Sequence, residues 1–125
     1  MLPYRISSTL RIWKYYVSFT EKAIYLVAVK GDLETLKTAL NSSQDKNPVV
    51  DEDRFYGNLT VLHVAAAAGH KNIVNWYKDV LGFDDLNPTN DKGITPLQLA
   101  VSEQKLGIVS FYIAKGYNAS SKFFV

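Results

Sequence analysis

The stretch Thr60-Val61-Leu62-His63-Val64-Ala65-Ala66-Ala67-Ala68-Gly69-His70 decides what fold we expect for this chain. Threonine is a residue type that caps helix N-termini with its hydroxyl, and the alanines that follow Thr60 favour helix. Gly69 supplies the left-handed backbone that ends many helices, and an apolar pattern resumes at Lys71-Asn72-Ile73-Val74. The stretch therefore predicts a turn, a short helix, a glycine break and a second helix.

Two further copies of this pattern flank it. One runs from Thr95-Pro96-Leu97-Gln98-Leu99-Ala100 to Val109, and a weaker one covers residues 23–34. The spacing from Thr60 to Thr95 is 95 − 60 = 35 residues. Alignment of Gly31 with Gly69 places Lys22 at the Thr position, 60 − 22 = 38 residues before Thr60. Because the helix pairs align without gaps, we expect the extra residues after the second helix of each copy, in 41–55 and 79–85.

The three copies, spanning Lys22 to Asn118, resemble the ankyrin repeat, whose pattern is T-P-L-H-x-A at a period of about 33 residues. The resemblance implies an all-α fold, an ankyrin-like solenoid of three helix-turn-helix repeats joined by hairpin-like loops. We expect one ankyrin-repeat domain over 22–125, with repeats at about 22–54, 55–89 and 90–119 and a tail at 120–125.

The third copy carries the most helix-start signals. Thr95 is an N-cap, Pro96 occupies the first helical position, and Gln98 forms a capping-box pattern with Thr95. The family usually has His at this position, as His63 is here, and the resemblance implies a structural imidazole. Gln104 replaces the Gly that ends the first helix, so we expect a strained or altered turn there. The residues of the structural motif are Thr60, His63, Gly69, Thr95, Pro96 and Gln98.

Apolar residues at helical spacing are expected to form the core. They are Ile24, Val27, Ala28, Leu33, Leu36, Leu40, Ile73, Val74, Tyr77 and Val80. We interpret the aromatic residues at helical spacing as core filling, because a base-stacking surface would need a basic groove beside it. They are Tyr15, Tyr16, Trp76, Tyr77, Phe111 and Tyr112.

Residues 1–21 favour a helix that caps the first repeat. Ile6, Leu10, Trp13 and Val17 fall on one helical face. The segment is also basic and has no acidic residue before Glu21, a composition shared with mitochondrial transit peptides, which is the alternative. The tail at 120–125 either covers the last helix pair or continues into a longer array.

Composition narrows the function classes. The chain has 125 residues and no cysteine, so it has no disulfide and no thiolate metal site. A net charge of +2 is too small to indicate nucleic-acid binding, and no apolar run reaches the length of about 20 residues that a membrane span needs. We expect the three Asn-x-Ser/Thr sequons to be accidental and the location to be cytoplasmic or nuclear, with mitochondrial import as the alternative.

The chemistry-bearing residues favour a structural role. His63 and His70 are the only histidines, and a zinc site needs three or four converging ligands. No glycine-rich phosphate loop occurs in the sequence. We expect no catalytic residue, no metal and no cofactor, and we give an unrecognised enzyme little weight.

Ankyrin-like arrays bind protein partners with the hairpin tips and the concave face of the first helices, and the resemblance transfers these positions to eleven residues. They are Tyr56, Leu59, Asp91, Lys92, Ile94, Val29, Lys30, Ala67, Ala68, Ser102 and Glu103. Two readings of the hairpin residues stay open: Tyr56, Leu59 and Ile94 are exposed apolar contacts, or Leu59 and Ile94 pack the hairpins together. Acidic loop residues, which steer a basic partner or are simply solvated, are Asp51, Glu52, Asp53, Asp84, Asp85 and Asp91.

We therefore predict a non-catalytic protein–protein interaction module. The alternative is a regulatory or targeting module of a larger or organelle-imported protein. The predicted partner is another protein rather than nucleic acid, and the chain is expected to be a monomer or part of a longer repeat array.

Overall fold

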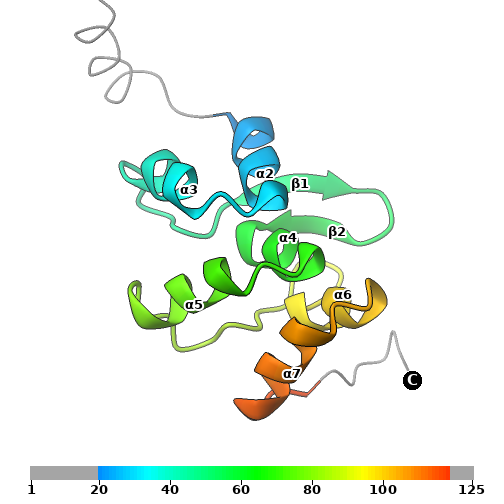
Figure 1. Cartoon of the computed structure of the whole chain (residues 1–125). Coiled ribbons are helices and arrows are strands. Elements are labelled where there is room, and N and C mark those ends of the chain that lie inside the picture. The colour runs from blue at the N-terminus through cyan, green and yellow to red at the C-terminus, as the bar shows by residue number, and fades with distance from the viewer. Residues whose placement is uncertain (1–19, 119–125) are drawn as a thin grey trace, which may run out of the picture.

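The computed structural model describes residues 20–118, in which three helix pairs stack side by side (Figure 1). The pairs are α2 (Glu21–Lys30) with α3 (Leu33–Leu40), α4 (Val61–Ala68) with α5 (Lys71–Asp79), and α6 (Pro96–Ser102) with α7 (Leu106–Ala114). The first helices of the pairs pack in sequence order, α2 on α4 and α4 on α6. Residues 1–19 of the predicted helix at 1–21, with Tyr15 and Tyr16, and the tail at 120–125 lie outside the described residues.

A β-hairpin precedes the second helix pair, so the expectation of an all-α chain is wrong in this region. β1 (Val49–Asp53) pairs antiparallel with β2 (Gly57–Thr60), with an irregular register between Val49 and Asp51. Asp53 Oδ1 accepts the backbone N–H groups of Phe55 at 2.7 Å and Tyr56 at 2.8 Å. This aspartate turn holds the tip, and the strands on either side of it are long enough to pair.

The first helix starts earlier than the repeat alignment predicts. Thr20, rather than Lys22, is the N-cap, and its hydroxyl accepts the N–H of Ala23 at 3.1 Å. α2 consequently has 10 residues, whereas α4 has 8 and α6 has 7. The rest of each pair aligns without gaps, because α3, α5 and α7 begin at Leu33, Lys71 and Leu106, at the expected offsets of 71 − 33 = 38 and 106 − 71 = 35 residues. The reason for the earlier start is chemical: a lysine side chain has no acceptor for a free backbone N–H.

In the second and third repeats, the loop before the first helix is hydrogen-bonded to the helix pair in the same way. The buried Tyr77 hydroxyl donates to the Lys46 carbonyl, and the buried Tyr112 hydroxyl donates to the Leu86 carbonyl. The next residue in each loop then accepts a helix-start N–H: Asn47 Oδ1 from Leu62 and Asn87 Oδ1 from Leu97, both at 2.9 Å. Burial raises the pKa of both tyrosines above the ordinary value, so both hydroxyls keep their proton and remain donors.

The core runs through all three repeats between the helices. Ile24, Ala28, Leu36, Leu40, Ile73, Val74 and Tyr77 are buried as predicted. Val80 is not in the core: α5 ends at Asp79, and Val80 is 70% exposed. Phe83 from the following loop packs edge-on against Tyr77 instead, with ring centroids 5.0 Å apart. Leu86 beyond it is fully buried.

The turn between α6 and α7 keeps the left-handed backbone of the second repeat although the glycine is missing, so of the two expected outcomes it is strained rather than different in shape. Gln104 adopts a left-handed φ of 59°, where the second repeat has Gly69 at φ 84°. A non-glycine residue in this region is strained because its Cβ crowds the backbone.

Candidate functional site

A hollow of about 320 Å³ lies between the β-hairpin and the first helices of the three repeats. Each of these elements contributes to its lining. The lining residues are Tyr25 and Val29 from α2, Asp51 and Asp53 from β1, Tyr56 and Leu59 from the hairpin, Val64, Ala67 and Ala68 from α4, and Leu99 and Glu103 from α6 and its end.

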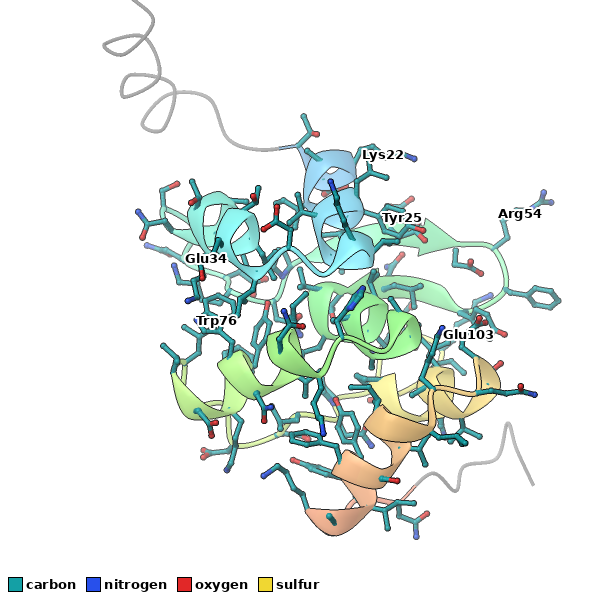
Figure 2. All side chains as sticks on the ribbon, viewed as in Figure 1. Lys22, Tyr25, Glu34, Arg54, Trp76 and Glu103 are labelled. Atoms are coloured by element: carbon teal, nitrogen blue, oxygen red, sulfur yellow. The ribbon has the colours of Figure 1, made fainter. Side chains whose placement is uncertain are left out.

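The bottom of the hollow is apolar and the sides are polar. Val64, Leu59 and Leu99 are buried, and the small side chains of Ala67 and Ala68 keep the surface low between α2 and α6. Figure 2 shows Tyr25 and Glu103 on the hairpin side of the molecule, with α4 between them. An apolar floor with polar walls is the usual makeup of a recognition surface.

Three carboxylates line the hollow, from Asp51, Asp53 and Glu103, and none of the described lining residues is Lys, Arg or His. Asp51 and Asp53 are two residues apart on β1, so both project from the same face of the strand, while Glu52 projects from the other. Within residues 20–118, no cation lies within ion-pair distance of any of the three. The hollow is therefore acidic, and its charge is not neutralised by the described part of the chain.

Six of the eleven residues transferred from the family resemblance line this hollow. They are Val29, Tyr56, Leu59, Ala67, Ala68 and Glu103. Ser102 lies at its rim, where its hydroxyl is 3.4 Å from the Tyr56 hydroxyl. Lys30 is exposed at the end of α2 and is not part of the lining.

The second turn is bound to the first hairpin rather than free. Asp91 Oδ1 accepts the Asn58 N–H at 2.9 Å, and Lys92 Nζ donates to the Arg54 carbonyl at 3.2 Å. Asn90 donates to the carbonyls of Tyr56 at 2.6 Å and Asn58 at 3.0 Å. Asp91 and Lys92 therefore hold the two loops together.

Of the two readings of Leu59 and Ile94, the exposed one is wrong, because both side chains are packed inside the molecule. Leu59 is 7% exposed and Ile94 is 3% exposed, and both belong to the core. Leu59 lies on β2, and because a strand alternates its faces, Leu59 points inward while Asn58 and Thr60 are less buried. Ile94 is buried in the loop before α6. Of the three apolar hairpin residues, only Tyr56 keeps a partly exposed surface.

Both histidines make structural hydrogen bonds. His63 is fully buried: Nε2 lies 2.9 Å from the Ile94 carbonyl, and Nδ1 lies 2.8 Å from the Thr60 hydroxyl. The neutral tautomer with its proton on Nε2 satisfies both contacts. Burial lowers the pKa of His63, and the bond to Ile94 opposes this only in part.

His70 joins the first and second repeats, with Nε2 2.6 Å from the Val29 carbonyl. In the described part of the chain, no group of three or more His, Asp or Glu side chains is placed to hold a metal ion.

Sequence reasoning missed several residues that shape the site. Tyr25, Val64 and Leu99 line the hollow, although each lies inside a repeat copy with no pattern that marks it as a surface residue. Asparagine is a common turn residue, and Asn90 Oδ1 accepts the N–H of Ile94 within its own loop, yet Asn90 Nδ2 also joins the two loops. No local pattern signals these roles, because each depends on a segment more than 30 residues away.

The comparisons with known proteins agree with this architecture. Residues 23–122 match the family model described as ankyrin repeats (3 copies). The chain therefore belongs to the ankyrin-repeat family, whose members are generally protein–protein interaction modules and typically non-catalytic.

Two curated relatives are long spider proteins. Alpha-latrotoxin-Lh1a of Latrodectus hasselti is 32% identical over 68 residues, which is 54% of this chain and 5% of that protein. Alpha-latrotoxin-Lg1a of Latrodectus geometricus gives the same identity and coverage. The match thus covers about a twentieth of each relative's length. Among the described residues, no helix has the length and apolar character needed to cross a membrane.

Proposed function

We propose that this chain binds a protein partner through the hollow between the hairpin and helices α2, α4 and α6. The observation that carries the proposal is convergence: three repeats and the hairpin contribute to one hollow with an apolar floor. A surface assembled from several repeats presents a continuous recognition face, as stacked repeats do.

Binding by this surface requires little rearrangement of the protein. Asn90, Asp91 and Lys92 tie the second turn to the first hairpin, and α2, α4 and α6 pack on one another. A pre-organised surface avoids the entropy cost of ordering loops on binding. The partly exposed Tyr56 provides the aromatic side chain most often found at the centre of such interfaces.

The test is affinity capture from a lysate of the source cells with quantitative mass spectrometry. The site variant is Val29→Gln with Ala68→Gln, which fills the hollow with two longer side chains at residues that are not buried. The matched control is Ile113→Gln with Ala114→Gln, which likewise replaces one β-branched aliphatic residue and one alanine with glutamine, on α7 and outside the hollow.

A partner retained by the wild type and the control, but lost from the site variant, supports the proposal. A partner retained equally by all three proteins overturns the placement of the interface. Circular-dichroism melts of both variants check that each is folded, because surface substitutions are expected to change stability by no more than about 0.5 kcal/mol.

A further inference from the structure

The charge of the hollow indicates the chemistry of its occupant. Its three carboxylates converge from two sides: Asp51 and Asp53 from the hairpin, and Glu103 from the end of α6. Like charges around one hollow repel one another, and a cation bound between them offsets that repulsion. The described residues supply no such cation within ion-pair distance.

Two nearby lysines contact groups other than the three carboxylates, one at the hairpin tip and one on the Tyr25 ring in the wall of the hollow. Lys92 Nζ donates to the Arg54 carbonyl at the hairpin tip, and Lys22 Nζ lies 5.6 Å from the centre of the Tyr25 ring. Arg54 projects from the tip away from the helices (Figure 2). Neither lysine is among the residues that line the hollow.

The carboxylates are accompanied by aromatic and apolar side chains. Tyr25 and Tyr56 stand in the walls, and Val64, Ala67 and Ala68 form the floor. A long basic side chain suits this combination, because its methylene stem packs on apolar surface while its charged head reaches the acids. A guanidinium also forms bidentate bonds to carboxylates and stacks on aromatic rings.

We propose that the hollow binds an arginine or lysine side chain from an extended segment of a partner protein. In that segment, apolar residues flank the basic residue. Asp51 and Glu103 contact the charged head from opposite walls, and Tyr25 and Tyr56 border its stem. This inference rests on the proposed function, because it names the class of partner for the same surface.

The probe is the peptide acetyl-Gly-Ser-Leu-Arg-Leu-Ser-Gly-amide, titrated into the full ¹⁵N-labelled chain at about 20 mM salt, where charge interactions are little screened. The matched peptide replaces arginine with citrulline, which has nearly the same shape and no charge. We expect the arginine peptide to shift the amide resonances of Asp51, Leu59 and Ala68. We expect the citrulline peptide to bind about fivefold or more weakly.

The protein variant pairs Asp51→Asn with Glu103→Gln. Asp53 is left unchanged because it accepts the N–H groups of Phe55 and Tyr56 in the hairpin tip. The control pairs Glu52→Gln with Asp84→Asn, which changes the net charge equally at exposed residues outside the lining. We expect the site variant to lose about fivefold in affinity for the arginine peptide and the control to lose none.

The outcomes separate the two proposals. Equal binding of both peptides in the hollow overturns the proposal that the hollow recognises a basic side chain. It does not contradict the proposed protein-binding function. Equal losses in the two variants show a general charge effect and also overturn it. If neither peptide shifts the resonances of the hollow at about 10 mM, the inference fails, and the capture experiment still decides the proposed function by itself.

Discussion

The second and third repeats are two versions of one helix pair, and their differences show which residues the fold requires. With an offset of 95 − 60 = 35 residues, the buried Leu62 corresponds to Leu97 and the buried Tyr77 corresponds to Tyr112. The exposed residues Lys71 and Lys78 correspond to the exposed Leu106 and Ile113. These interior positions match because each side chain is fully buried in its helix pair, whereas the exposed positions differ in residue type.

Two structural positions differ between these repeats despite having the same role. His63 and Gln98 both accept the N–H of the N-cap threonine, through Nδ1 at 3.4 Å and Oε1 at 2.9 Å respectively. Gly69 and Gln104 both adopt the left-handed backbone at the end of the first helix. The comparison teaches that the fold requires the hydrogen bond and the backbone shape. The residue type can change as long as the new residue supplies them.

The largest effect is expected in the core that both repeats share. Leu62→Ala should lower the free energy of unfolding by about 4 kcal/mol and Leu97→Ala by about 3 kcal/mol. Both leucines are fully buried, but Leu62 lies in α4, which packs on both α2 and α6. Urea unfolding followed by circular dichroism measures both values, and a greater loss for Leu97→Ala would contradict the central role of the second repeat.

The turn that ends the first helix should respond in opposite directions in the two repeats. Gly69→Ala should cost about 1–2 kcal/mol, because a Cβ is strained at φ 84° and meets Lys105 Cδ at 3.1 Å. Gln104→Gly should stabilise the protein by about 0.5–1 kcal/mol, because it relieves a left-handed side-chain residue. Thermal melts compare the two variants, and a loss of stability in Gln104→Gly would argue against strain at that turn.

A smaller effect on stability is expected at the two N-cap threonines. Thr95→Ala should cost about 1 kcal/mol, and Thr60→Ala somewhat more, about 1.5 kcal/mol. Each hydroxyl accepts an N–H, from Gln98 at 3.2 Å or His63 at 3.4 Å, but Thr60 also contacts the His63 ring at 2.8 Å. Thr38→Ala, at an exposed threonine inside α3, serves as the control and should change stability by less than about 0.5 kcal/mol.

The smallest effect near neutral pH is expected from His63. Its pKa lies below the ordinary value of 6.5 in the folded protein because burial disfavours the charged ring. Below about pH 6.5 the unfolded chain therefore binds more protons than the folded one, and stability falls as the pH falls. His63→Gln, which copies Gln98, should flatten the melting temperature between pH 7.5 and about pH 5. An unchanged slope would show that other groups carry the pH dependence.

A separate carboxylate acts at lower pH. The hydrogen bonds from Thr35 hold the pKa of Asp32 below its ordinary value of 3.8. Its contribution to stability is therefore present above that value and is lost as the pH falls below it. The two groups act in different pH windows, so the His63→Gln comparison is not confounded.

The sequence by itself determined the family, the repeat register of the second and third helix pairs, and the Thr95 capping box. These features depend on residues three or four apart, whose side chains meet within one helical turn. The same local reasoning applies to Gln104, where the absence of glycine predicts a strained turn. Local patterns did not predict the start of α2, because the N-cap Thr20 precedes Lys22, the residue that the repeat alignment placed at the cap.

Only the tertiary structure decided which candidate residues share a surface. It buried Leu59 and Ile94, engaged Asp91 and Lys92 between two loops, and left Val80 exposed beyond the end of α5. It also brought Asp51 and Glu103, 103 − 51 = 52 residues apart in sequence, to one hollow. The physical reason is that burial and charge proximity depend on how the elements pack, and packing joins residues between which the sequence records no local pattern.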